Sequence, residues 1–294
     1  MSSYKRLMNE IAVSTSLLRE LNCEESLQLR AILLQIADDI LRVCKKYHLN
    51  VMYGGGSALG AVRHHGFIPW DDDLDLLMPR ADFNIFKNVF QKELGEKYDL
   101  NAPNYSCQAY ARFPKVEKKG TVLSQLQKTP RKIAVDIFLI ENVPGNVLHR
   151  KLHGYWAQLM MAIAGQVGFK EMAGTEMKRY MCSVKEGKRM YYVKLFVGYI
   201  FGIIPAWKWY NIADKALQYK SYEGLWGICS GRKHYFGEIF PKEEYLPVIY
   251  ETFEGRQVPV PHGIDAYLTN LYHDYMTLPP EDKRERHFIS DIKF

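Results

Sequence analysis

Residues 53–80 read YGGGSALGAVRHHGFIPWDDDLDLLMPR and join a glycine turn to an acidic run. The turn consists of Gly54–Gly56 and is followed by Ser57. Glycines let backbone amides come close to a phosphate, and a serine hydroxyl adds a further hydrogen-bond donor. The acidic run contains Asp71–Asp73 and Asp75, and carboxylates are the usual protein ligands of Mg²⁺ or Mn²⁺. The combination predicts a site for nucleotide–metal chemistry.

The acidic run continues into an apolar stretch that has the composition of a strand. In a strand that includes Leu74–Leu77, successive side chains point to opposite faces. This alternation would place Asp71, Asp73 and Asp75 on one face and Asp72 on the other. We therefore predict that three of the four aspartates point into one site and that Asp72 is structural.

A second apolar run, residues 133–140, has the length of a strand and contains a single acidic residue, Asp136. Burying an uncompensated carboxylate is costly, so Asp136 is expected to face a cation or a cavity. We predict that Asp73, Asp75 and Asp136 ligate the metal, and that Asp71 is a further ligand or the general base. These four are the predicted catalytic residues. The alternative is a solvated acidic loop beside a half-exposed Asp136 at the end of a strand.

Seven further residues are predicted to bind substrate phosphates. The glycine turn leads into a helix predicted over residues 57–63, and the N-terminus of such a helix attracts an anion. A guanidinium offers paired donors to a phosphate, although each basic residue here could equally belong to a surface loop. Trp70 is predicted to pack in the core, with a pocket for a quaternary ammonium as the alternative. The predicted phosphate-binding residues are Gly55, Gly56, Ser57, Arg63, His64, Arg112 and Lys115.

The composition narrows the class of partner. The chain has 294 residues, of which 47% are hydrophobic, and a formal net charge of +6. This charge favours a nucleotide or an acidic membrane surface, and no nucleic-acid partner is predicted because no recognition signature accompanies it. The five cysteines are dispersed without a Cys-x-x-Cys pair, which favours reduced thiols. No signal segment is visible at the N-terminus. We expect a cytoplasmic protein, either free or peripheral at the inner face of the cell membrane.

Hydrophobic periodicity up to residue 144 predicts a mixed sheet with flanking helices, an α+β fold. Asn22 and Glu25 form a predicted capping box, and residues 115–120 are predicted to form a basic turn between two strands. Helices are predicted over residues 4–21, 24–47, 57–63 and 79–94, and strands over residues 51–53, 108–113, 121–126 and 133–140.

The composition changes after residue 144. Residues 148–222 are predicted to be helical and are rich in Met, Tyr and Trp, whereas the segment from residue 235 is rich in proline and loops. Two uncharged stretches, Tyr155–Phe169 and Leu195–Trp207, are shorter than the roughly 20 apolar residues of a membrane-spanning helix. The first is predicted to be buried. The second has aromatic and lysine flanks, so burial and shallow contact with a membrane interface are both open.

Several blocks of the sequence resemble known families. Gly55–Ser57 followed by Asp73–Asp75 resembles the glycine–serine turn and Asp-x-Asp signature of the nucleotidyltransferase fold. The longer string over residues 60–79 is similar to the LicD family of bacterial phosphocholine transferases, whose relatives include fukutin-like sugar-phosphate transferases. Residues 135–138 resemble the Val-Asp-Ile-Phe strand of that family, and residues 252–261 resemble its Phe-Glu-Gly segment that ends in Val-Pro.

The resemblance extends to the C-terminal region. Residues 267–268 resemble the family's Tyr-Leu pair, and residues 272–280 are similar to its Tyr-Gly-Asp-Tyr-Met-x-x-Pro-Pro ending, with Arg284 and His287 after it. His273 is a departure, because a glycine is common at that position. The resemblance implies a nucleotidyltransferase-like catalytic core over residues 1–144 and a segment over residues 231–294 that completes it. Residues 145–230 would form a helical subdomain.

The resemblance also implies an activity. It implies metal-dependent transfer of phosphocholine, or another CDP-activated alcohol or polyol phosphate, to a sugar hydroxyl of a cell-surface glycan or teichoic-acid-type precursor, with release of CMP. The partners would be the CDP-activated donor, a glycan or lipid-linked glycan acceptor and the membrane through residues 195–207. Two other functions stay open: transfer of NMP from an NTP with release of pyrophosphate, and a non-catalytic module that binds a nucleotide or a polar headgroup.

Overall fold

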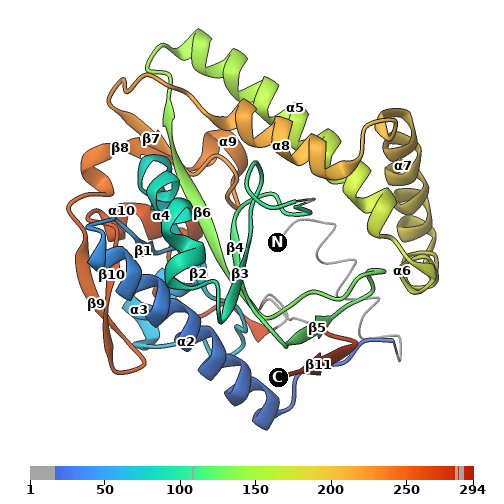
Figure 1. The fold of residues 1–294 in the computed structure, drawn as a ribbon, viewed down its shortest axis with the longest axis horizontal. Coiled ribbons are helices and arrows are strands. Elements are labelled where there is room, and N and C mark those ends of the chain that lie inside the picture. Colours follow the sequence, from blue (N-terminus) through green and yellow to red (C-terminus); the bar gives the residue numbers. More distant parts are fainter. Residues whose placement is uncertain (1–16, 108, 282–283, 285–287) are drawn as a thin grey trace.

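The computed structural model describes residues 17–107, 109–281, 284 and 288–294, and it has the expected α+β architecture. One curled sheet contains most of the strands, in the order β1-β2-β6-β4-β3, and β7 and β8 extend it from the end of β6 (Figure 1). The strands of this sheet are β1 (Met52–Tyr53), β2 (Asp75–Pro79), β3 (Tyr98–Asn101), β4 (Lys115–Lys118), β6 (Ala134–Val143), β7 (Leu225–Gly227) and β8 (Ile239–Pro241).

The central pair of strands positions the acidic residues. β2 and β6 run parallel, and their register pairs Asp75 with Asp136. Antiparallel β1 pairs with β2 on the other side and leads directly into the glycine turn. The two aspartates that the sequence places 61 positions apart therefore stand side by side at the same end of neighbouring strands.

Helices cover the sheet and the site. α2 (Cys23–Lys46) begins with the predicted capping box, in which Asn22 accepts the backbone N–H of Glu25 and the Glu25 side chain accepts that of Asn22. Its apolar stripe and that of α4 pack on the sheet and form the main core. The other helices are α3 (Gly55–His64), α4 (Arg80–Glu93), α5 (Val147–Met172), α6 (Thr175–Met181), α7 (Lys185–Phe201), α8 (Ala206–Leu217), α9 (His234–Gly237) and α10 (Ile264–Tyr272), with a 3₁₀ turn η1 (Lys242–Glu244).

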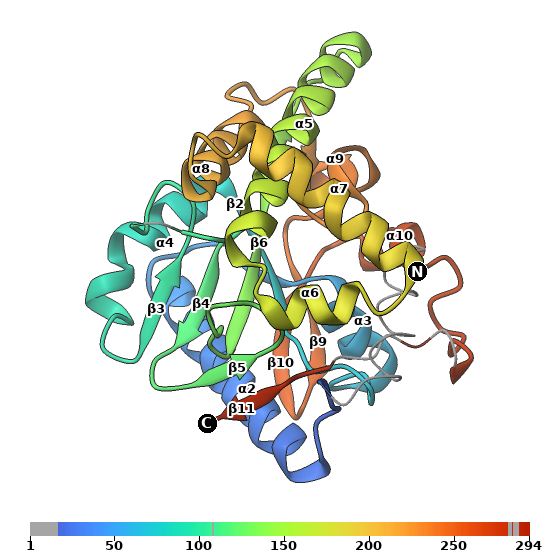
Figure 2. The ribbon, with the colours of Figure 1, turned by 90° about the vertical axis from the view of Figure 1, so that its right-hand side faces the viewer.

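The helical subdomain α5–α8 stands beside the sheet, as the second view shows (Figure 2). α5 packs along both α7 and α8. Only one face of α5 is buried: Ala157 and Ala164 are buried, but Tyr155 and Trp156 are exposed. The prediction that residues 155–169 are buried therefore holds for one face of the helix and is wrong for the other.

A hairpin and a strand pair complete the fold. β9 (Ile249–Phe253) and β10 (Arg256–Val260) are joined by Glu254 and Gly255, both at positive φ, as a tight two-residue hairpin turn requires. β5 (Val122–Ser124) pairs with β11 (Asp291–Lys293). The C-terminal region thus contributes strands and a helix, where the sequence had predicted mainly loops.

Several predicted elements need correction. Residues 115–120 were expected to be a turn, but Lys115–Lys118 form β4 because this segment pairs with both β3 and β6. Residues 109–113 form no strand, and residue 108 lies outside the described residues. β3 was not predicted. The helix predicted over residues 4–21 falls largely on residues 1–16, outside the described ones, and residues 17–22 are not helical.

Candidate functional site

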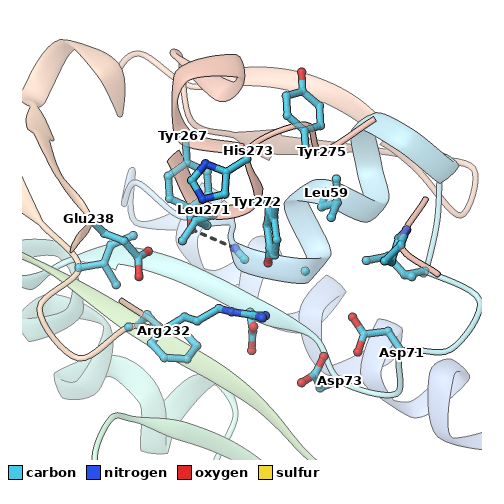
Figure 3. Close-up of a pocket in the computed structure, with 18 of the residues that line it drawn as sticks. Leu59, Asp71, Asp73, Arg232, Glu238, Tyr267, Leu271, Tyr272, His273 and Tyr275 are labelled. Atoms are coloured by element: carbon cyan, nitrogen blue, oxygen red, sulfur yellow. Dashed lines mark hydrogen bonds between the residues drawn. The ribbon is translucent and has the colours of Figure 1, made fainter. Parts of the chain in front are cut away.

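A cavity of about 890 Å³ lies between the glycine turn, the acidic run and the C-terminal region. Its walls come from the N-terminal half of α3, residues 68–77, the loop before α9 and the segment from α10 to Arg284 (Figure 3). Segments separated by more than 200 positions in the sequence therefore meet at one site.

The glycine turn forms the floor beside the strands. The Gly54 N–H donates to the carbonyl of Asp75 at 3.0 Å, which ties the turn to the start of β2. Gly55 has φ +50, a left-handed conformation that favours glycine. Its N–H donates to the Tyr267 hydroxyl at 3.0 Å, so a side chain from α10 reaches the N-terminus of α3.

Two carboxylates lie against the glycines. A Cβ atom at Gly56 would be 2.7 Å from Asp71 Oδ2, and one at Gly55 would be 3.0 Å from Asp75 Oδ2. Only glycine therefore allows the turn and the carboxylates to approach so closely. Burial and the nearby charges of Asp73, Asp136 and Asp71 raise the pKa of Asp75 well above its usual value. The site thus concentrates negative charge next to an anion-binding turn.

Asp136 stands beside this group but has a partner of its own. Lys115 Nζ donates to Asp136 Oδ1 at 2.5 Å, and the ammonium lies 4.9 Å from the centre of the Phe113 ring. Within the described ranges, no group of three His, Cys, Asp or Glu side chains is arranged to hold a metal ion. The all-oxygen donor set itself suits Mg²⁺ or Mn²⁺. The donors are therefore of the right kind, but they are not assembled as a ligand set.

The structure brings most of the predicted site residues together. The ones that line the cavity are Gly55, Gly56, Arg63, Asp71, Asp73, Asp75 and Arg112. Ser57, His64, Lys115 and Asp136 lie next to it without lining it. The Ser57 hydroxyl accepts the backbone N–H of Asp75 at 2.9 Å and is nearly buried, so it braces the start of β2.

Three aspartates of the acidic run were predicted to share one face of a strand, but only one of them lies in a strand. β2 begins at Asp75, so Asp71 and Asp73 lie in the loop before it and strand alternation does not order them. Arg30 holds that loop, because its guanidinium donates to the backbone carbonyls of Ile68, Pro69 and Asp71.

Arg63 and His64 connect α3 to the C-terminal segment. Arg63 Nη1 donates to the carbonyl of Tyr275 at 2.6 Å, and its Nε donates to His64 Nε2 at 2.9 Å. Burial lowers the pKa of His64, which is consistent with an imidazole that accepts this hydrogen bond. Arg63 therefore positions the cavity wall as well as facing the cavity.

Among the lining residues that were not predicted as site residues are Arg232, Glu238, Tyr267, Tyr272 and Arg284. The Arg232 guanidinium lies 5.5 Å from the centre of the Tyr272 ring, and that of Arg284 lies 4.4 Å from the Trp70 ring. Tyr267, Tyr272 and Arg284 fall in the C-terminal block of family resemblance, which was a usable signal. No motif surrounds Arg232 or Glu238.

Two other C-terminal residues, Glu254 and His273, shape the backbone around the site. Glu254, at the tip of the β9–β10 hairpin, accepts the N–H of Phe67 at 3.1 Å, and its own N–H donates to the carbonyl of His65 at 2.9 Å. This contact fixes the chain that leads into the acidic run. His273 has φ +61, a conformation that glycine adopts without strain, which explains the glycine common at that position in the resembling family. His287 lies outside the described residues.

Gly56→Ala is expected to lower the activity of the site while leaving the fold intact. The new methyl group would meet Asp71 Oδ2 at 2.7 Å. The carboxylate can rotate away, so we expect a change of less than about 1 kcal/mol in the free energy of unfolding. Displacing a reacting group by about 1 Å can cost about 100-fold in turnover. Turnover and thermal melting would be compared with those of Gly174→Ala, where the nearest atom is in ordinary contact at 3.4 Å. Equal turnover in both variants would contradict a role for this close packing.

Comparisons with known proteins agree with this geometry. Residues 48–161, which include the glycine turn and both aspartate strands, match the model of the LicD/FKTN/FKRP nucleotidyltransferase domain. The chain is 28% identical over 265 residues to lipopolysaccharide cholinephosphotransferase LicD of Haemophilus influenzae, covering 88% of this chain and 94% of that protein. It is also 34% identical over 77 residues to an uncharacterized protein of Rickettsia typhi, covering 26% of this chain and 25% of that protein. Residues 48–161 therefore match a LicD-type nucleotidyltransferase domain, and the chain is similar to LicD of Haemophilus influenzae over most of its length.

Proposed function

We propose that this protein transfers phosphocholine, or a related alcohol or polyol phosphate, from a CDP-activated donor to a sugar hydroxyl of a cell-surface glycan precursor and releases CMP. The observation that carries the proposal is the joint lining of one cavity by a helix N-terminus, the three aspartates Asp71, Asp73 and Asp75, and four arginines. The arginines are Arg63, Arg112, Arg232 and Arg284. Helix N-termini and guanidinium groups bind phosphates, whereas carboxylates bind the cations that accompany them. The cholinephosphotransferase of Haemophilus influenzae supports the choice of phosphocholine.

The proposed reaction is a substitution at phosphorus. The sugar hydroxyl oxygen forms a bond to the phosphorus that carries the alcohol, and the bond to the bridging oxygen of the diphosphate breaks. CMP departs with the electrons of that bond. One of the carboxylates that face the cavity, Asp71, Asp73 or Asp75, accepts the hydroxyl proton. The arginines and the α3 N-terminus hold the charged diphosphate in line with the acceptor.

A divalent cation, Mg²⁺ or Mn²⁺, belongs to the proposal. Asp73, Asp75 and Asp136 would hold it, and it would offset the negative charge on the leaving phosphate. Asp136 would first have to exchange its ion pair with Lys115. Lys115 would then be close enough to the site to donate to a phosphate oxygen, the role predicted for it from the sequence.

The test is nucleotide release from CDP-choline, CDP-glycerol, CDP-ribitol and CTP, with and without EDTA, in the presence of a membrane glycolipid extract as the acceptor. We expect metal-dependent release of CMP from one CDP-alcohol. Release of pyrophosphate from CTP would instead make the protein a nucleotidyltransferase. Absence of release from all four donors, with extracts from several bacteria, would contradict the proposed transfer.

We also propose that the acceptor is reached at a membrane surface through α7 and the turn that follows it. In the described part of the chain no single helix is long and apolar enough to cross a bilayer. Only α7 and α8 taken together meet that criterion, and they are bent by 85°. α7 and the turn after it expose a stripe of apolar side chains at helical spacing: Tyr192 (47% exposed), Phe196 (67%) and Tyr199 (67%) on α7, and Ile203 (93%) in the turn.

Charge complementarity supports a lipid partner for this stripe. Lys188 and Arg189 are exposed one turn before Tyr192, and exposed Lys208 lies 5.3 Å from the centre of the Trp207 ring at the other end. Basic residues around an apolar and aromatic face are typical of helices that lie in the interface of an anionic membrane.

The triple substitution Phe196→Ser, Tyr199→Ser and Ile203→Ser is expected to abolish binding to vesicles of phosphatidylglycerol and phosphatidylcholine. These exposed side chains contribute little to the fold, so the melting temperature should change little. Co-sedimentation would measure binding. The matched control replaces Leu27, Ile85 and Tyr250 by Ser, since these residues are similarly exposed on the catalytic core. Equal sedimentation of both variants would contradict the proposed surface.

A further inference from the structure

Glu238 is a buried acid at one end of the cavity. It follows α9 directly, is only 3% exposed and lines the cavity. In Figure 3 its carboxylate points into the cavity from the side opposite Asp71. The site described above for the diphosphate and the cation does not use it.

Backbone N–H groups of the turn before α9 hold the Glu238 carboxylate. Its Oε1 accepts the N–H of Lys233 at 3.2 Å. The charges of Lys233 and Arg232, in the turn before α9, favour the ionised carboxylate. The Lys233 ammonium itself donates to the carbonyl of Asn270, and the Arg232 guanidinium lies over the Tyr272 ring. Burial raises the pKa of Glu238 to about 7. A cation that entered this end of the cavity would favour the ionised form.

The surroundings of Glu238 suit an organic cation. Ile228, Leu271 and Tyr267 line the cavity and belong to one buried cluster. The Ile228 N–H donates to the Glu238 carbonyl at 3.1 Å, and Figure 3 shows Tyr267 and Leu271 on the Glu238 side, so the carboxylate is set beside an apolar and aromatic wall. Quaternary ammonium groups bind where aromatic and apolar surfaces accept their methyl groups and a desolvated anion accepts their charge. A metal ion would instead require several oxygen ligands.

The position of Glu238 relative to the acidic run indicates which end of the donor would lie beside Glu238. In Figure 3 Asp71 and Asp73 lie at the side of the cavity away from Glu238, and Arg232 extends from the side of Glu238 toward them. A diphosphate bound beside these aspartates would therefore leave the Glu238 side for the group attached to the outer phosphate.

We propose that Glu238, with the wall formed by Ile228, Leu271 and Tyr267, binds the cationic end of the donor alcohol and makes the site selective for a charged amino alcohol over a neutral polyol. This inference rests on the proposed function, because it assigns the alcohol end of the same donor.

Glu238 also has a structural contact that the experiment must separate from binding. A Cβ atom at Gly231 would lie 2.5 Å from Glu238 Oε1, so the carboxylate packs tightly against the turn that carries Arg232. Glu238→Gln keeps an oxygen that can accept the Lys233 N–H and removes only the charge. If Glu238 merely held the turn, the substitution would affect every CDP-alcohol equally.

The experiment is isothermal titration calorimetry of CDP-choline and CDP-glycerol, which share the nucleotide and the diphosphate. For Glu238→Gln we expect the Kd for CDP-choline to rise roughly 10-fold and that for CDP-glycerol to change less than about 2-fold. The control Glu243→Gln, at an exposed position of η1, should change neither. Equal effects on both ligands, or no effect on either, would overturn the assignment of Glu238. Wild-type protein that binds neither nucleotide would overturn the proposed function as well.

Discussion

Asp75→Asn is expected to lower the rate of CMP release by at least about 1,000-fold while the protein stays folded. Asp75 lies at the meeting point of the glycine turn and the two parallel strands, opposite Asp136 in the register. The amide has nearly the shape of the carboxylate but supplies no negative charge for a divalent cation. The backbone N–H that donates to Ser57 is unchanged, so the local structure should persist.

Asp75→Asn is expected to be more stable than the wild type near pH 7, although it is less active. The pKa of Asp75 is raised by burial and by neighbouring carboxylates, so ionising it destabilises the folded state. This destabilisation develops as the pH rises from the pKa of the unfolded chain toward that of the folded one. Without metal, the variant should therefore melt at a higher temperature than the wild type near pH 7, and the difference should shrink toward pH 4.

Asp72→Asn is the matched control for this experiment. Asp72 belongs to the same acidic run but is not among the residues that line the cavity. Its turnover should stay within a few-fold of the wild type. Wild-type turnover of Asp75→Asn at saturating Mg²⁺ would contradict the assignment of the acidic site.

Arg80→Leu is expected to lower the free energy of unfolding by about 3–5 kcal/mol, the cost of leaving buried charges without their partner. Arg80, the first residue of α4, donates through Nε to Glu141 of β6 at 2.9 Å and through Nη2 to Asp214 of α8 at 2.8 Å. Both carboxylates are almost fully buried, and burial raises the pKa of Glu141. The ion triad joins the helical subdomain to the sheet, so its loss should loosen α8 first.

Urea unfolding would measure this effect, and hydrogen exchange of α8 would localise it. Arg42→Leu provides the control, because Arg42 pairs with Asp39 at an exposed position. Such a surface pair typically contributes less than about 1 kcal/mol. A loss of similar size in both variants would show that the buried triad contributes no more than a surface pair.

Local sequence patterns determined much of the fold. The capping box at Asn22 and Glu25, the apolar stripe of α2 and the apolar run of β6 depend on neighbours within a few residues, and the structure confirms these elements. The α+β fold class follows from the order of such elements. β4 was misjudged as a turn because its charged residues are stabilised by strands on both sides, which a local pattern does not reveal.

The sequence by itself determined that a glycine turn, an acidic run and an aspartate-bearing strand belong to this protein, because each is a contiguous motif with its own chemistry. Only the tertiary structure decided that Asp75 and Asp136 are register partners, that Asp136 is paired with Lys115, and that Arg232 and Glu238 face the same cavity. These relations join distant residues through strand pairing and helix packing; Asp71 and Glu238, which face one cavity, are 167 positions apart. Contacts over such separations are set by how whole elements pack, and no local propensity encodes them.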